Sequence, residues 1–274
     1  MTVERSTVRE RQWQAWAGTV GDLSRLGDAI AQMVELRRNA ALQEFDEETK
    51  RLNNEEGSWL DWNAERKADR DILERDVVRS TASEGTDKAS GSMEDILPEI
   101  DRRTTDTVSF EYRSPSLRLA SRSGDTLRVR LSRSGHRPGV TLEVVSSNQG
   151  WAKQTAVHLD EEIEKGKPGW AWVHTPIGIA ALFAAVFLVV AITVTLILWP
   201  HIGGKYAGTI SVLLGSAIGC PIGTACISAK PREWFFPRFE IYGESGASSG
   251  YRRAGYLVGL VSALVIGIVV NLIS

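Results

Sequence analysis

The chain has 274 residues, a formal net charge of −2 and 43% hydrophobic residues, all ordinary values that permit one large domain or two modest ones. With only two cysteines, Cys220 and Cys226, it has no disulfide framework of the kind found in small exported domains. Charge and apolar character are segregated, because residues 1–105 are rich in Arg, Glu, Asp and Lys whereas residues 177–274 are largely apolar.

The first 80 residues are predicted to form a charged helical hairpin or a short coiled coil. Helical periodicity over 5–54 predicts one helix with an apolar stripe, and Trp59 and Trp62 begin a second helix over about 59–80. Arg37 occupies a seam position, which excludes a long coiled coil. The stripe is either a plain packing face or a partner site; it consists of Val20, Leu23, Leu26, Ile30, Met33 and Val34.

A polar linker is expected over 81–105, since "STASEGTDKASGSME" at 80–94 is rich in Ser, Gly and Thr. From 106 to 168 we expect a small antiparallel α+β module with the order ββββα. Alternating residues predict strands around 108–112, 117–119, 127–131 and 140–144. A helix over about 150–165 would cover their apolar face with Trp151, Thr155, Leu159 and Ile163.

The polar side of this module is rich in arginine. The residues are Arg113, Arg118, Arg122, Arg128, Arg130, Arg133 and Arg137. One interpretation is a surface for anionic lipid headgroups, and the others are a nucleotide or nucleic-acid ligand or simply a solubilising strand face. Aromatic residues do not alternate with the arginines, so the sequence disfavours nucleic acid as a partner.

Residues 169–274 are predicted to be a transmembrane α-helical bundle of three helices, at 177–199, 206–228 and 254–273, because each is a long uncharged run. Lysine and arginine are concentrated between the second and third runs, which predicts a multi-pass protein of the bacterial inner (plasma) membrane with a cytoplasmic N-terminus and an external C-terminus. In this scheme the lipid contacts are Arg118, Arg128, Arg130, Arg238, Arg252 and Arg253.

Small residues recur every fourth position in the second and third of these runs. Such stripes allow close backbone packing between helices, within one chain or in a homo-oligomer. The expected packing residues are Ala207, Ser211, Gly215, Gly219, Gly223, Gly255, Gly259, Ala263 and Gly267.

No catalytic motif is evident. The four histidines, His136, His158, His174 and His201, are isolated from one another, and no metal-ligand spacing, GxSxG elbow or phosphate-binding loop occurs. We therefore expect a protein that is not an enzyme and has no cofactor and no metal.

Two segments, "WFFPRFEIYG" at 234–243 and "NQGWAKQTAVHLDEEIEKGKPGWAWVHTP" at 148–176, resemble stretches of uncharacterised multi-pass membrane proteins of bacteria and their phages. The resemblance covers about a third of the chain and implies no activity. The function expected from the sequence is a membrane protein that tethers a cytoplasmic helical and β sensor or scaffold module, with a protein partner on the N-terminal helices. The alternative is a homo-oligomeric pore-forming or membrane-disrupting effector of the toxin or phage-defence type.

Overall fold

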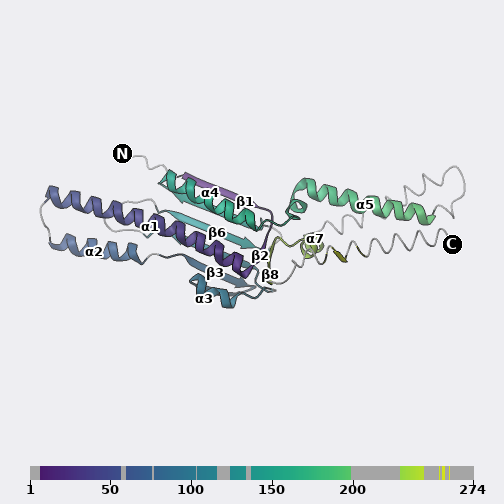
Figure 1. Cartoon of the computed structure of the whole chain (residues 1–274), viewed down its shortest axis with the longest axis horizontal. Helices are drawn as coiled ribbons and strands as arrows, with labels where there is room; N and C mark the ends of the chain where they lie inside the picture. Colours follow the sequence, from purple (N-terminus) through teal and green to yellow (C-terminus); the bar gives the residue numbers. More distant parts are fainter. Residues whose placement is uncertain are drawn as a thin grey trace.

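The computed structural model describes residues 7–56, 60–75, 77–102, 104–115, 124–133, 137–198 and 229–243, together with 253, 255, 256 and 259. The described chain is an α+β fold built on a six-stranded sheet with the strand order β1-β7-β6-β5-β3-β4, in which every neighbouring pair is antiparallel. A projecting pair of helices and a further helix extend from opposite ends of this body (Figure 1).

The centre of the sheet is the predicted meander. Strands β5 (Thr107–Arg113), β6 (Thr126–Ser132) and β7 (Val140–Ser146) alternate buried and more exposed residues, as the period of two requires. The fourth expected strand, at 117–119, lies outside the described residues. Helix α4 (Gln149–Lys165) buries Trp151, Thr155, Leu159 and Ile163, which confirms the predicted covering helix.

Strands β1, β3 and β4 complete the sheet where the sequence predicted other structure. Residues expected to begin the first helix form β1 (Thr7–Trp13), which pairs with β7, and then β2 (Trp16–Thr19), which lies outside this sheet. Residues expected to be linker form the hairpin of β3 (Arg79–Glu84) and β4 (Asp87–Gly91), whose turn places Gly85 at a positive φ of 54°. The short helices α3 (Met93–Ile96) and η1 (Leu97–Glu99) follow.

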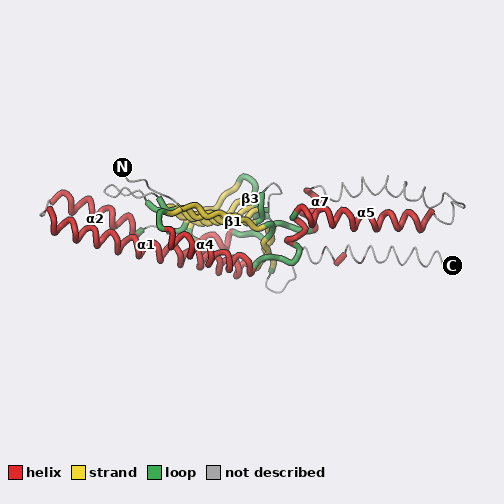
Figure 2. Tube along the Cα trace, turned by 90° about the horizontal axis from the view of Figure 1, so that it is seen from above, coloured by secondary structure: helices red, strands yellow, loops and turns green. Residues whose placement is uncertain are grey.

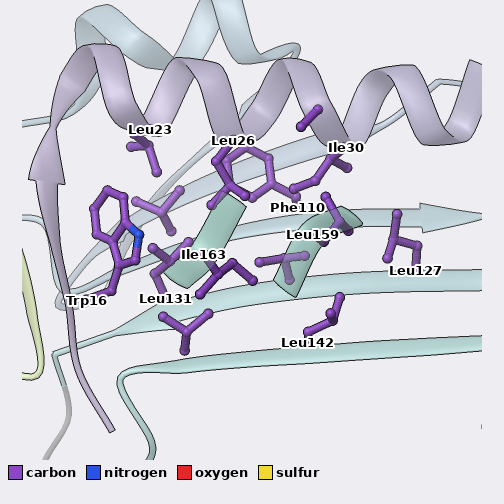
Figure 3. Close-up of a cluster of buried hydrophobic side chains, with 14 of the residues drawn as sticks. Trp16, Leu23, Leu26, Ile30, Phe110, Leu127, Leu131, Leu142, Leu159 and Ile163 are labelled. Atoms are coloured by element: carbon purple, nitrogen blue, oxygen red, sulfur yellow. The ribbon is translucent and has the colours of Figure 1, made fainter. Parts of the chain in front are cut away.

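The hydrophobic core lies between one face of the sheet and two helices, α4 and the first half of α1 (Val20–Glu56) (Figure 2). Figure 3 shows Leu23, Leu26 and Ile30 of α1 directed towards Phe110, Leu127 and Leu142 of the strands. Since these side chains are almost fully buried, they are the main apolar contribution to the stability of the body. The opposite face of the sheet carries the more polar residues of each strand.

The second half of α1 extends past the end of the sheet and packs against α2 (Leu60–Glu74), so the two form a projecting hairpin (Figures 1 and 2). At about 1.5 Å per residue, the 37 residues of α1 span roughly 55 Å. The predicted helical hairpin is therefore present, although it begins at Val20 rather than near residue 5.

At the other end of the body, chain segments far apart in sequence pack together. Strand β2 pairs in parallel with β8 (Phe239–Tyr242), and the rings of Trp16 and Phe239 stack with 5.9 Å between centroids. The last described elements before β8 in the chain are η2 (Ala171–His174), α5 (Pro176–Leu198) and α7 (Ala229–Phe235). The start of α5 contacts this junction, where Leu182 packs against Ala17, Trp170 and Val173.

The prediction of a three-helix transmembrane bundle is wrong. In the part of the chain that the structure describes, no helix is both long enough and apolar enough to cross a bilayer. Most of the first expected span is α5, and the expected spans at 206–228 and, apart from 255, 256 and 259, 254–273 lie outside the described residues. The reason for the error is that a long uncharged run is not by itself sufficient evidence for a span.

The predicted location and orientation depended on those spans. The assignment to the inner membrane, with an internal N-terminus and an external C-terminus, is contradicted by the same finding. The pore-forming alternative relied on the same spans, and no finding tests it.

Candidate functional site

The projecting hairpin is attached to the body by a buried ion pair. Nε of Arg37, on α1, donates to Oδ2 of Asp125 at 2.6 Å, and the two side chains are only 6% and 4% exposed. Asp125 lies immediately before β6, and its Oδ1 accepts a hydrogen bond from the Ser146 hydroxyl at 2.6 Å. Because both carboxylate oxygens and Nε of the guanidinium are engaged, the direction in which α1 leaves the sheet is fixed by charged groups as well as by apolar packing.

Further contacts lie along the hairpin beyond this anchor. Nη1 of Arg37 lies 3.5 Å from Oε1 of Glu44, the next contact outward along α1. Among the hairpin side chains whose burial is described, those up to residue 51 and from residue 64 on, apolar packing between α1 and α2 is a cluster of Ala41, Phe45 and Leu73, with Leu42 against it. This cluster is separate from the core of the body.

Ion pairs on the hairpin surface add cross-links between the two helices. Arg70 of α2 contacts Asp46 of α1 at 3.2 Å and Glu74 of its own helix at 3.0 Å. The hydrogen bond to Glu74 and then the charge of Asp46 raise the pKa of Arg70 above its ordinary value. These pairs are exposed, so each contributes little stability.

Large apolar side chains remain exposed along this element. Leu36 on α1 is 48% exposed, Ile72 on α2 is 41% exposed, and Val77, just after α2, is 68% exposed. Single exposed apolar residues are common, but here they lie on or directly after a helix pair that projects from the body.

The junction at the other end of the body contains a second polar cluster. His174 is 4% exposed, and its Nε2 lies 2.7 Å from the carbonyl oxygen of Phe236. A carbonyl only accepts, so Nε2 carries the proton in the neutral ring. Burial, then the nearby charge of Arg238, lowers the pKa of His174 to about 4.

Arg238 closes this junction from the other side. Its Nη1 donates to the carbonyl oxygen of Arg137 at 3.1 Å and lies 3.4 Å from Oε1 of Gln14. The main chain of Arg238 also accepts from the Trp16 N–H at 2.8 Å. Arg238 was predicted to contact lipid, but the structure places it inside the junction, where it is 9% exposed and links three chain segments.

A pocket of about 480 Å³ lies between β1, the end of α4 and η2. Its charged lining is already paired, because Arg11 contacts Asp160 and Lys167 contacts Glu164 at 3.0 Å. Trp13 also donates to Glu164 at 3.2 Å. With these groups engaged by one another, the pocket offers no charged group left to recognise a ligand.

The remaining predicted arginines are dispersed. Arg128 pairs with Glu111 at 2.7 Å on the open face of the sheet, which it shares with Arg130. Arg253 donates to the carbonyl oxygen of Trp234, and its guanidinium lies 4.7 Å from the centre of that ring. Arg118 and Arg252 lie outside the described residues.

Most of the predicted helix-packing stripe lies outside the described residues, namely Ala207, Ser211, Gly215, Gly219, Gly223, Ala263 and Gly267. Gly255 and Gly259 are described, and a Cβ built on either would meet no atom within 4 Å among the parts of the chain that the structure describes. The stripe stays a prediction. Over the same described parts, no group of three His, Cys, Asp or Glu residues is arranged to hold a metal.

Sequence reasoning noted Arg37 only as a break in the heptad pattern and missed its partner. A charged residue within an apolar helical stripe is itself a signal, because it requires a buried partner. Asp125 gave no comparable signal, since it lies in a turn sequence 88 residues away. Comparison with known proteins identifies no family model, no curated protein and no solved structure that matches this chain.

Proposed function

We propose that this protein is a scaffold that binds a protein partner through the α1–α2 hairpin. The observation that carries the proposal is a helix pair that extends beyond the sheet from a buried ion pair and leaves large apolar side chains exposed. Elements that stabilise only a fold are usually packed against it over their length, whereas the outer half of α1 extends past the end of the sheet beside α2.

The partner that best suits this surface is an amphipathic helix. Two antiparallel helices present a shallow groove, and a third helix packed along it would bury apolar anchors at helical spacing. Leu36 on α1 and Ile72 on α2 are exposed apolar residues that would serve as such anchors. Charge is mixed along the hairpin, with Glu47, Glu48, Lys50 and Arg51 all exposed. Recognition therefore depends on the apolar anchors more than on net charge.

The buried ion pair supports this role. It fixes the direction of the hairpin relative to the sheet without adding much net stability, since desolvation offsets most of the attraction. A partner held on the hairpin is thereby held at a defined position relative to the body.

The test compares full-length variants in the native host by affinity purification and quantitative mass spectrometry. The double variant Leu36→Glu/Ile72→Glu places charge on the proposed surface, and Val157→Glu is the matched control, because Val157 is 45% exposed on α4, outside the hairpin. We expect one protein to be depleted at least tenfold with the double variant and retained with the control, and to bind directly once purified. Equal recovery with both variants would contradict the proposal.

A further inference from the structure

The open face of the sheet, which no described helix covers, contains an arginine in an unusual setting. The register places Arg130 of β6 directly between Ser109 of β5 and Thr141 of β7. Residues directly opposite one another on neighbouring strands point to the same face. Arg130 therefore stands between two hydroxyl-bearing side chains, with no acidic residue in either directly paired position.

The guanidinium of Arg130 has no protein partner among the described residues. Its Nε is buried and donates to no acceptor among the described residues. By contrast Arg128, two residues earlier on the same face, pairs with Glu111 at 2.7 Å. Buried donors in folded proteins are nearly always satisfied, so an unsatisfied guanidinium nitrogen calls for an explanation.

The charges that act on Arg130 are of its own sign. Burial, then the charges of Arg137 and Arg128, lowers the pKa of Arg130 below its ordinary value. Arg137 lies in the turn before β7, and its backbone is fixed by the hydrogen bond from Arg238. Both charged groups that lower this pKa are guanidinium groups, and like charges that act on one another cost free energy in the absence of an anion.

We propose that Arg130 and Arg137 form a binding site for a phosphate group, with the hydroxyls of Ser109 and Thr141 as further donors. Guanidinium groups present planar pairs of N–H donors that match phosphate oxygens, and a bound dianion would relieve the repulsion between them. This site goes beyond the proposed scaffold role, because it lies on the sheet and not on the hairpin. The phosphate could belong to a small soluble molecule or to a lipid headgroup, and both present the same oxygens.

The test uses the full chain and two probes. The first is inorganic pyrophosphate, titrated by calorimetry. The second is co-sedimentation with vesicles of phosphatidylglycerol and phosphatidylcholine, compared with vesicles of phosphatidylcholine alone. The variants are Arg130→Gln and, as a matched control, Arg113→Gln, since Arg113 is exposed at the opposite end of the same face. Circular dichroism confirms that each variant is folded.

We expect pyrophosphate to bind the wild-type chain and the Arg113→Gln variant equally, and Arg130→Gln to bind about tenfold or more weakly, the usual effect of losing a charged hydrogen bond. Binding to the anionic vesicles alone, with the same dependence on Arg130, would support the site and identify a lipid headgroup as the source. Failure of both probes to bind would overturn the proposal, as would binding that Arg130→Gln does not weaken.

Discussion

Arg37 and Asp125, 88 residues apart in the chain, form a 2.6 Å ion pair at the point where the helical hairpin leaves the sheet. Neither residue has a role in the apolar core, yet both are nearly as buried as the core itself. Removing one partner would leave a charge that cannot reach water, whereas removing both leaves none. This asymmetry makes the pair a direct probe of how the hairpin is attached.

We predict that Asp125→Ala lowers the free energy of unfolding by about 3–5 kcal/mol. The change leaves the buried guanidinium of Arg37 without its carboxylate and removes the oxygen that accepts the hydrogen bond from the Ser146 hydroxyl. The double variant Arg37→Leu/Asp125→Ala should recover more than half of that loss. Urea unfolding followed by circular dichroism measures both. If the single and double variants were equally destabilised, the ion pair would not be the source of the effect.

Stability should depend on pH through His174. Its pKa is about 4 in the folded chain against an ordinary value of 6.5, so the unfolded state binds the proton more tightly. The stability is therefore highest above pH 6.5 and falls as the pH falls towards 4, with a loss of about 2.5 kcal/mol at pH 4.5.

The variant His174→Gln should remove this dependence, since a Gln amide donates to the Phe236 carbonyl without titrating. The comparison is the difference in unfolding free energy between pH 7 and pH 4.5, with His158→Gln, on the surface helix α4, as the control. If His174→Gln loses as much unfolding free energy between pH 7 and pH 4.5 as the wild type does, groups other than His174 are responsible for the pH dependence.

Gly139 marks a place where three chain segments approach closely. A Cβ at this position would lie 2.7 Å from Cα of Ala15 and 2.9 Å from the carbonyl oxygen of Gln14, and closer still to the carbonyl oxygen of Arg238. All three contacts are backbone and cannot rotate away. We predict that Gly139→Ala destabilises the protein by more than about 2 kcal/mol.

The control for this change is Gly124→Ala, because the nearest atom to its Cβ would be 3.9 Å away. Thermal unfolding of the two variants side by side distinguishes a steric effect from the general effect of replacing glycine. Equal melting temperatures would mean that the close approach at Gly139 is not a constraint.

For Arg130 we predict that a substitution raises the stability of the protein, unlike the substitutions above, which lower it. Arg130→Gln removes a half-buried charge whose pKa is lowered by burial and by neighbouring like charges, and whose buried Nε has no acceptor among the described residues. We therefore expect the variant to be more stable than the wild type by roughly 0.5–1 kcal/mol, whereas Arg128→Gln, which breaks the pair with Glu111, should be neutral or slightly destabilising. Melting temperatures measured without phosphate provide the test, and a lower value for Arg130→Gln would contradict it.

Local patterns in the sequence predicted those elements whose contacts lie close in the chain. The alternation in β5, β6 and β7 and the four-residue stripe of α4 are both confirmed, because neighbouring strands and their covering helix follow one another directly. The same holds for the hairpin of α1 and α2, whose helical periodicity is strong.

The errors lie where pairing is distant. Strand β1 adds to β7, more than 120 residues later, and β2 pairs with β8, more than 210 residues later. Nothing local in "TVRERQW" distinguishes an edge strand from the first turns of a charged helix. The polar hairpin of β3 and β4 was expected to be linker because Ser and Gly favour loops, although Ser80 and Ala82 are buried beside Phe110 and Val108. The ion pair at the base of the hairpin could not be predicted for the same reason, because Arg37 and Asp125 are far apart in the sequence.

The most direct test of the central claim is site-specific photo-crosslinking in the native host, with a photoreactive phenylalanine analogue at Ile72 and, as the control, at Val157. If the hairpin binds a protein partner, the analogue at Ile72 gives one discrete adduct of a different protein, and the adduct disappears when Leu36→Glu is added. The analogue at Val157 gives no such band. The same bands from both positions, a homodimer alone, or no adduct at Ile72 would contradict the claim that the α1–α2 hairpin is the partner-binding element.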